Sequence, residues 1–108
     1  MALLKERDIE RHLVREVKKL GGEIRKVKWI GRRNAPDRRV MLPGFCFWCE
    51  VKRPGEWATP AQAREHTVIR RTGETVYVLN TIESINKLLG AHRAKIAALV
   101  KGILDGKA

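Results

Sequence analysis

Two carboxylates and a lysine occur at a spacing that suits hydrolysis of a phosphodiester bond. Asp37 stands in a loop, and Glu50 and Lys52 lie two residues apart at the end of an apolar segment. Residues two apart in a strand share one face, so Glu50 and Lys52 would point the same way. Two carboxylates can bind Mg²⁺, which keeps waters and substrate phosphate as its other ligands. A nearby lysine can orient a metal-bound water, so the three residues indicate metal-assisted hydrolysis.

The alternative interpretation is that these charges are only solvated. Asp37 would then relieve repulsion within the basic loop 31–39, and Glu50 and Lys52 would form an ordinary exposed pair. A hairpin between the segments 39–42 and 45–52 favours the chemical interpretation, because it would bring Asp37 beside Glu50.

The C-x-x-C pair of Cys46 and Cys49 resembles a redox or zinc motif only in its spacing. It lies in GFCFWCEVK, an apolar stretch that predicts a strand. Residues three apart in a strand face opposite sides, so the sulfurs would point apart. The sequence has no second cysteine pair to complete a zinc site. We therefore expect both cysteines to be buried structural residues.

Hydrophobic periodicity predicts one α/β domain with a central mixed sheet. The first helix carries an apolar stripe at helical steps and ends at Gly21-Gly22, and Thr59-Pro60 is typical of a helix start. The expected elements are a helix over 2–20, strands over 23–30, 39–42 and 45–52, a helix from 60 to about 72, a strand over 75–80, and helices over 82–89 and 91–104.

The charge of the chain indicates a polyanionic partner. It has 108 residues with 23 Lys and Arg against 12 Asp and Glu, a net charge of +11. Residues 1–55 carry most of the excess. No apolar run reaches the length of a membrane span, and the first residues lack the pattern of a secretory signal. We therefore expect a cytoplasmic protein that binds nucleic acid.

Several blocks resemble one nuclease family. Pro36-Asp37, followed after twelve residues by Glu50-Val51-Lys52, resembles the PD-(D/E)xK nuclease superfamily. The narrower resemblance is to its VRR-NUC domain, over residues 3–90. The blocks that carry it are E-x-x-I at 6–9, Gly21-Gly22, N-A-P-D-R at 34–38, E-V-K-R-P-G at 50–55 and T-P-A-Q at 59–62. The resemblance implies a restriction-endonuclease-like αβββαβα fold over a single domain, 1–108, of the stand-alone phage type.

The resemblance also implies roles for particular residues. Asp37, Glu50 and the backbone carbonyl of Val51 would bind Mg²⁺ or Mn²⁺. Lys52 would act on the attacking water, and Gln62 would sit beside the metal site. Attack in line on phosphorus would leave 5′-phosphate ends.

A third acid is expected from the first helix. At about 100° per residue, Glu6 falls in the middle of the apolar stripe and Glu10 at its edge. A carboxylate on a buried stripe needs a cation or a hydrogen bond. Glu6 also fits the E-x-x-I block, so we favour Glu6 and keep Glu10 as the alternative. Both acids would otherwise only favour the helix dipole.

Other residues are expected at the nucleic acid or at the surface. Trp57 is predicted either to stack on an unpaired base or to cap the core. The histidines, His12, His66 and His92, are predicted to be surface or rim residues, and a position near bound DNA is the alternative for His66. The predicted phosphate contacts are Lys28, Arg32, Arg33, Arg38, Arg39 and Arg53.

The resemblance implies a homodimer that cuts DNA four-way (Holliday) junctions, in a bacterial cell and in DNA repair. A two-fold dimer places two active sites on opposed strands, which suits such a junction. The apolar stripe of helix 91–104 is either the dimer seam or packs on its own sheet. The alternatives are a flap or single-strand nuclease, or a basic DNA-binding protein without activity.

Overall fold

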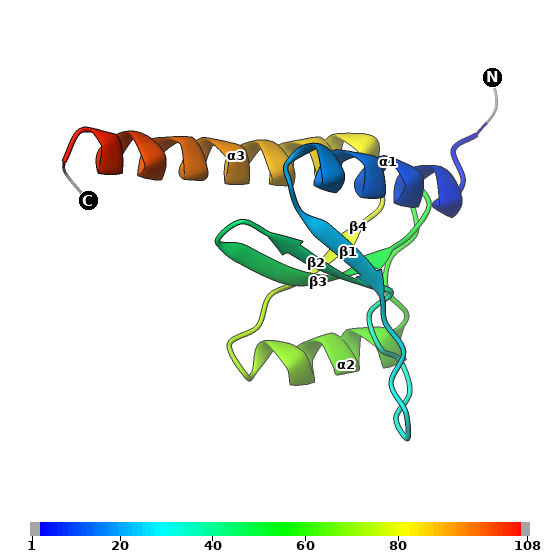
Figure 1. Cartoon of the computed structure of the whole chain (residues 1–108). Coiled ribbons are helices and arrows are strands. Elements are labelled where there is room, and N and C mark those ends of the chain that lie inside the picture. The colour runs from blue at the N-terminus through cyan, green and yellow to red at the C-terminus, as the bar shows by residue number, and fades with distance from the viewer. Residues whose placement is uncertain (1–2, 107–108) are drawn as a thin grey trace.

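The computed structural model describes residues 3–106 and has three helices and four strands (Figure 1). Their order, α-β-β-β-α-β-α, confirms the predicted fold class. The elements are α1 (Glu6–Lys19), β1 (Glu23–Lys26), β2 (Arg38–Leu42), β3 (Phe45–Val51), α2 (Pro60–Arg70), β4 (Val76–Leu79) and α3 (Ile82–Leu104).

The four strands form one mixed sheet in the order β1-β2-β3-β4. β1, β2 and β3 are antiparallel neighbours, whereas β4 pairs with β3 in parallel after the crossover through α2. α1 and α3 cover one face of the sheet and α2 covers the other (Figure 1). Alternate residues of β3 therefore face different layers.

The core lies between the sheet and the pair α1 and α3. Ile9, Leu13 and Val17 of α1 are fully buried, as the periodicity predicted, and they share one cluster with Phe47 and Cys49 of β3. Gly22 allows α1 to turn closely into β1, because a Cβ there would lie 2.8 Å from the Met41 carbonyl oxygen.

Three predicted boundaries differ from the structure by more than two residues. α1 begins at Glu6 rather than residue 2, which lies outside the described residues. β1 ends at Lys26, because the next residues leave the sheet towards α2. The two expected helices over 82–89 and 91–104 form one helix, α3, through Gly90. A glycine weakens a helix by about 1 kcal/mol, but it ends one only where φ becomes positive, and Gly90 is not among the positive-φ glycines.

The prediction that both cysteines are buried is wrong for one of them. Cys49 lies in the core, and burial raises the pKa of its thiol. Cys46 is exposed, next to the hairpin turn at Pro43-Gly44. The opposite exposure of the two residues agrees with the expected alternation of the strand.

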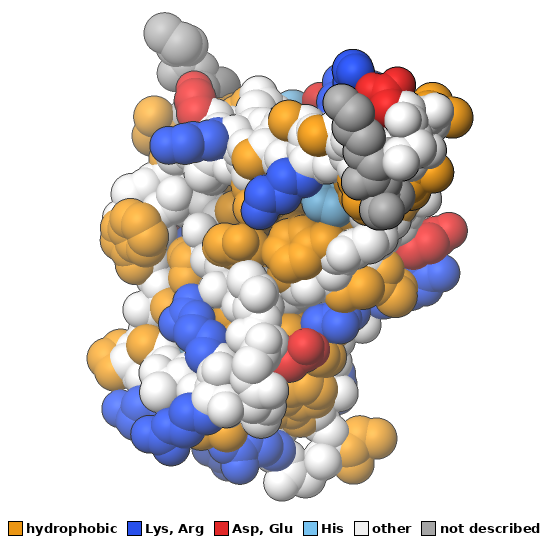
Figure 2. Space-filling model, turned by 90° about the vertical axis from the view of Figure 1, so that its left-hand side faces the viewer, with side chains coloured by type: hydrophobic (Ala, Val, Ile, Leu, Met, Phe, Trp, Pro, Cys, Tyr) orange, Lys and Arg blue, Asp and Glu red, His pale blue; other side chains and the backbone are white. Residues whose placement is uncertain are grey.

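The C-terminal half of α3 extends beyond the sheet (Figure 1). Ile96 packs over the hairpin turn, since a Cβ on Gly44 would lie 3.3 Å from its Cδ1. Leu99, Val100 and Ile103 remain exposed. Figure 2 views this end of the molecule, with apolar side chains around a histidine beneath the helix. No helix within residues 3–106 is both long and apolar enough to cross a membrane.

Candidate active site

The hairpin of β2 and β3 brings Asp37 to the end of β3. Arg38 at the start of β2 is the register partner of Cys49, so Asp37 and Glu50 follow as neighbours across the two strands. The backbone N–H of Val51 donates to Asp37 Oδ2 at 2.8 Å. This contact fixes the Asp37 carboxylate at the edge of the sheet where β3 ends.

Glu50 is a buried acid whose side chain is turned towards α2. The residue is 1% exposed. Burial, together with a hydrogen bond to Asp37 and the charge of Asp37, raises the pKa of Glu50 to about 8. Two carboxyl groups this close cannot both ionise near neutral pH without a positive charge between them. The pair therefore has the electrostatic character of a cation site.

His66 of α2 contacts the same carboxyl group. Its Nε2 lies 3.0 Å from Glu50 Oε1, and the residue is 1% exposed. Burial and the charge of Arg70 lower the pKa of His66, which favours a neutral imidazole. The prediction of a surface or rim position is therefore wrong for His66. His92 is buried as well, stacked on Phe45 at 5.7 Å, whereas His12 is half-buried.

Sequence reasoning missed the role of His66 because a histidine on a weakly amphipathic helix carries little signal by itself. Glu65 and His66 are adjacent in α2, and both residues are buried. Two consecutive buried polar residues would have been the clue, since buried polar groups need partners.

Lys52 and Glu6 complete the charged group around Asp37 and Glu50. The charge of Lys52 opposes the rise in the pKa of both Glu50 and Glu6. The pKa of Glu6 is raised by partial burial and by the charge of Asp37. Glu6 is the first residue of α1 and is exposed, so the expectation that it lies in the buried stripe is wrong. The stripe is covered only from Ile9 onwards.

Glu10 is engaged elsewhere. Its Oε2 accepts from Arg38 Nε at 3.1 Å, and the Arg38 side chain is 12% exposed. Of the two candidate acids on α1, Glu6 is thus the one whose pKa the charge of Asp37 raises.

Gln62 lies at the start of α2 and forms a capping box with Thr59. Its Oε1 accepts from the Thr59 N–H at 2.9 Å, and its own N–H donates to Thr59 Oγ1 at 3.2 Å. In this conformation the side chain fixes the beginning of the helix that carries His66.

The donor set suits a hard divalent cation that also binds substrate. Within residues 3–106 no three His, Cys, Asp or Glu side chains converge to hold a metal alone. Mg²⁺ is commonly bound by one or two carboxylates, waters and substrate phosphate, so two acids suffice. The mutual repulsion of Asp37 and Glu50, and the nearby Glu6, supply the negative charge that such an ion neutralises.

A second buried carboxylate organises the basic loop between β1 and β2. Glu65 of α2 accepts from Trp29 Nε1 at 2.7 Å and from Arg32 Nε at 2.8 Å. Its side chain is only 7% exposed. The loop is therefore attached to α2 by one acid, which the sequence analysis did not single out.

Four of the six predicted phosphate contacts pair with carboxylates in this structure. Arg32 pairs with Glu65 and Arg38 with Glu10. The other two pairs are Arg39 with Glu74 at 3.1 Å and Arg53 with Glu56. Arg39 also stacks over Trp48, 4.4 Å from the ring centroid. Each would have to release or share a carboxylate in order to bind DNA.

Lys28 and Arg33 are exposed and have no ion pair within the described residues. Arg33 lines a cavity of about 270 Å³ with Arg64 of α2. Arg64 was not predicted as a contact, although its position two residues after Gln62 places it on the helix beside the loop.

Trp57 does not cap the core. It lies in the loop that follows Lys52 and is 69% exposed. Of the two expectations for Trp57, only an exposed role such as base stacking agrees with this position.

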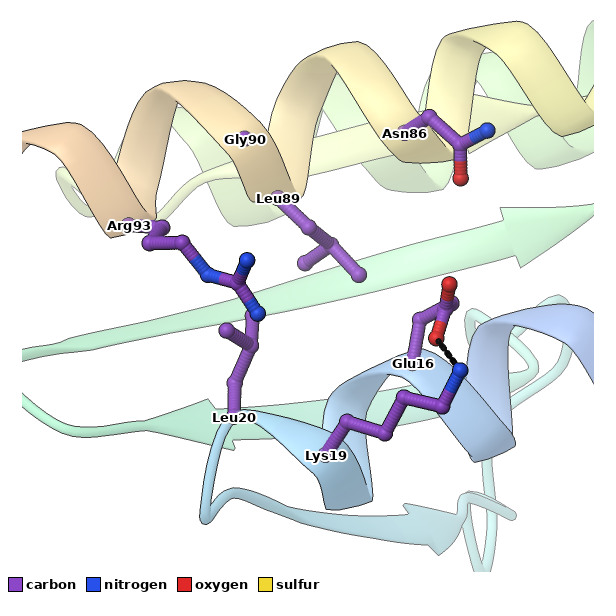
Figure 3. Close-up of a pocket in the computed structure, with 7 residues that line it drawn as sticks. All are labelled: Glu16, Lys19, Leu20, Asn86, Leu89, Gly90 and Arg93. Atoms are coloured by element: carbon purple, nitrogen blue, oxygen red, sulfur yellow. Dashed lines mark ion pairs between the residues drawn. The ribbon is translucent and has the colours of Figure 1, made fainter.

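A groove between α1 and α3 is separate from these residues (Figure 3). It has a volume of about 290 Å³, and it is lined by residues such as Glu16, Asn86 and Arg93. Glu16 pairs with Lys19 at 3.1 Å. The groove contains neither Asp37 nor Glu50, so it is not the candidate active site.

Comparison with known proteins gives two informative relatives. A protein named "Putative nuclease p44" from Acyrthosiphon pisum secondary endosymbiont phage 1 is 45% identical over 92 residues, which are 84% of this chain and 98% of that protein. A solved structure of a VRR_NUC domain is similar with a TM-score of 0.73 and 32% identity, over 79% of this chain and 94% of that chain. No family model matches the sequence.

A mixed sheet with paired acids and a lysine at one edge, together with these relatives, defines a nuclease of the restriction-endonuclease-like class. The chain belongs to the VRR-NUC family.

Proposed function

We propose that the protein is a Mg²⁺- or Mn²⁺-dependent endonuclease that cuts branched DNA. The observation that carries the proposal is the buried Glu50 beside Asp37 at the end of β3, where the two acids repel each other. Lys52 follows Glu50 by two residues. A DNA-binding protein without activity would have no use for such a pair. Negative charge near the DNA repels phosphate, and burying an acid costs stability.

Each residue has a role in this proposal. Asp37, Glu50 and the Val51 carbonyl would hold the cation, with Glu6 adding negative charge. A bound divalent ion would lower the pKa of water and stabilise the charge on the reacting phosphate. Lys52 orients the attacking water by hydrogen bonding. His66 and Gln62 act from α2, His66 on the Glu50 carboxyl and Gln62 on the helix start.

The DNA would lie across the loop between β1 and β2, α2 and the loop after β3. Lys28, Arg33 and Arg64 are exposed cations of this face that form no ion pair within residues 3–106. Arg32, Arg38, Arg39 and Arg53 stay predicted contacts that act by exchanging a carboxylate for a phosphate. Trp57 is available for stacking on an unpaired base.

We propose further that residues 1–108 act as one domain and form a homodimer that cuts four-way junctions. Support comes from exposed apolar side chains in the C-terminal half of α3, Leu99, Val100 and Ile103. This half of the helix extends past the sheet (Figure 1). Ile96 by contrast packs on its own hairpin turn. Light scattering after size exclusion tests this, with Val100→Asp expected to give a monomer.

The test of the function is a panel of labelled DNAs, linear, nicked, flapped, forked and four-way, incubated with Mg²⁺ or Mn²⁺. Symmetric cuts on opposed strands of the four-way DNA are expected. Preferred cleavage of the flap or of single strands would support the alternative nuclease. Binding of every DNA without cleavage in either metal would contradict the proposal and favour a DNA-binding protein.

A further inference from the structure

Ile30 lies in the loop between β1 and β2 and is 99% exposed; Ile30 and Gly31 are called the tip of this loop. Lys28 precedes it, and Gly31, Arg32 and Arg33 follow. Single exposed apolar residues are common on protein surfaces, so exposure alone carries no meaning. The distinctive feature is how firmly the loop around Ile30 is held.

The residues on both sides of the tip are fixed to one acid of α2. Trp29 Nε1 donates to Glu65 Oε2 at 2.7 Å, and Arg32 Nε donates to the same oxygen at 2.8 Å. The Trp29 ring also packs edge-on against Trp48 of β3, with centroids 5.5 Å apart. Ile30 and Gly31 are the two residues between these anchors.

The backbone directs the tip outwards. Gly31 has φ of +77°, a conformation that suits glycine and allows the chain to reverse between the anchors. The loop projects from the body of the molecule, at the lower right in Figure 1. Ile30 is thus presented on a preformed protrusion.

The base of the same loop is joined to the candidate active site. Val27 N–H donates to the backbone oxygen of Asp37 at 3.0 Å, which closes the loop at the residue predicted to bind the cation. DNA whose scissile phosphate lies at Asp37 therefore passes beside this loop. Lys28 and Arg33 lie close to the tip along the chain and offer charges for the flanking phosphates.

We propose that Ile30 is an apolar wedge that inserts between bases of the bound DNA, which makes it a specificity-determining residue of this nuclease. The inference rests on the proposed function. Apolar side chains that enter a base step unstack it at a cost of about a few kcal/mol, and the cost is least where bases are already unpaired. Because Glu65 already holds the loop in one conformation, the loop loses little conformational entropy when DNA binds. The wedge therefore favours branched over continuous DNA.

The test uses 2-aminopurine, whose fluorescence rises when it is unstacked, at the branch point of a four-way junction. Protein with Asp37→Ala keeps the DNA intact. When the protein binds the junction, the 2-aminopurine fluorescence should rise if Ile30 is retained, and it should also rise for Ile30→Leu. It should not rise for Ile30→Ser. We expect Ile30→Ser to weaken junction binding about tenfold, as for the loss of one buried isoleucine side chain, and duplex binding less than about twofold. Leu3→Ser is the matched control, because Leu3 is an exposed apolar residue that precedes α1 and lies outside the proposed dimer surface.

The outcomes separate the wedge from the nuclease. If the protein with an intact active site binds none of the DNAs or cuts none, the proposed function fails. If it cuts the junction but fluorescence stays unchanged, or Ile30→Ser behaves like Leu3→Ser, only the wedge is overturned. Thermal melting of Ile30→Ser should match that of the unmodified protein, since the side chain makes no buried contact.

Discussion

His66 Nε2 lies 3.0 Å from Glu50 Oε1, and both residues are 1% exposed. A helix on one face of the sheet thus holds the carboxyl group that β3 contributes to the candidate metal site. Because His66 holds one oxygen of the Glu50 carboxyl group, the second oxygen points in a defined direction. Hydrogen bonds to metal ligands from residues outside the metal site commonly orient those ligands in this way.

Removal of His66 should weaken cation binding through Glu50. We expect His66→Ala to reduce metal affinity by about 10- to 100-fold, the range for lost outer contacts at metal sites. Cleavage at saturating Mg²⁺ should recover in part. Titration of cleavage rate against Mg²⁺ measures this, with His66→Gln as the comparison, since an amide can still hydrogen-bond. Equal metal dependence in His66→Ala and the unmodified protein would show that the contact is only structural.

The candidate ligands and lysine should be indispensable for cleavage. Asp37→Ala, Glu50→Ala and Lys52→Ala should each lower the rate by about a thousandfold or more, because several kcal/mol of transition-state stabilisation are lost. DNA affinity should stay similar. Glu16→Ala, in the groove between α1 and α3, is the control and should cleave normally. Normal cleavage by any of the three variants would contradict the site.

Glu50 should make the stability of the metal-free protein fall as pH rises. Its pKa in the folded state is about 8 against 4.5 for the ordinary group, so the folded protein binds more protons between these values. The contribution is full below pH 4.5 and is lost through pH 8. Between pH 6.5 and 8 the loss amounts to about 1–2 kcal/mol.

Melting of the unmodified protein and Glu50→Gln in EDTA measures this effect. The melting temperature of Glu50→Gln relative to the unmodified protein should increase from pH 6.5 to 8. The pKa of His66 is lowered below its ordinary 6.5, so its titration lies largely under this window. A difference that is constant with pH would mean that Glu50 ionises normally.

Glu6 and Glu10 should respond differently to substitution. Glu6→Gln removes an acid whose pKa is raised by the charge of Asp37. It should lower the apparent affinity for Mg²⁺ several-fold and leave the melting temperature nearly unchanged. Glu10→Gln removes the negative charge opposite Arg38 but keeps an acceptor oxygen. It should destabilise the fold by about 1 kcal/mol, the difference between a charged and a neutral hydrogen bond. Comparison of metal titrations and melting curves separates the two. The reverse pattern would assign the third acid to Glu10.

The exposed cations should determine the salt dependence of DNA binding. Arg33→Glu and Arg64→Glu should each reduce the slope of log affinity against log salt by about 1, if each contacts one phosphate. Arg93→Glu, which lines the groove away from the site, should leave the slope unchanged. An unchanged slope in Arg33→Glu would place the DNA on another face.

The elements that make the candidate site could be predicted because they are local. Pro43-Gly44 joins two short strands, and their antiparallel register then brings Asp37 next to Glu50 without reference to the rest of the chain. The stripe of Ile9, Leu13 and Val17 predicted the buried face of α1 in the same way. The main errors in the elements concern their ends. α1 begins at Glu6, β1 ends at Lys26 where the chain turns towards α2, and α3 continues through Gly90.

Contacts between distant elements could not be predicted. The sequence alone determined the types and the order of the candidate catalytic residues, and a net charge that suits DNA. It did not tell which arginines pair with Glu10, Glu65 or Glu74, or that His66 faces Glu50. These pairs depend on how α1 and α2 lie on the sheet, which side-chain packing over the whole core decides. The tertiary structure therefore determines which of the many charged side chains pair with one another and which remain available to bind a substrate.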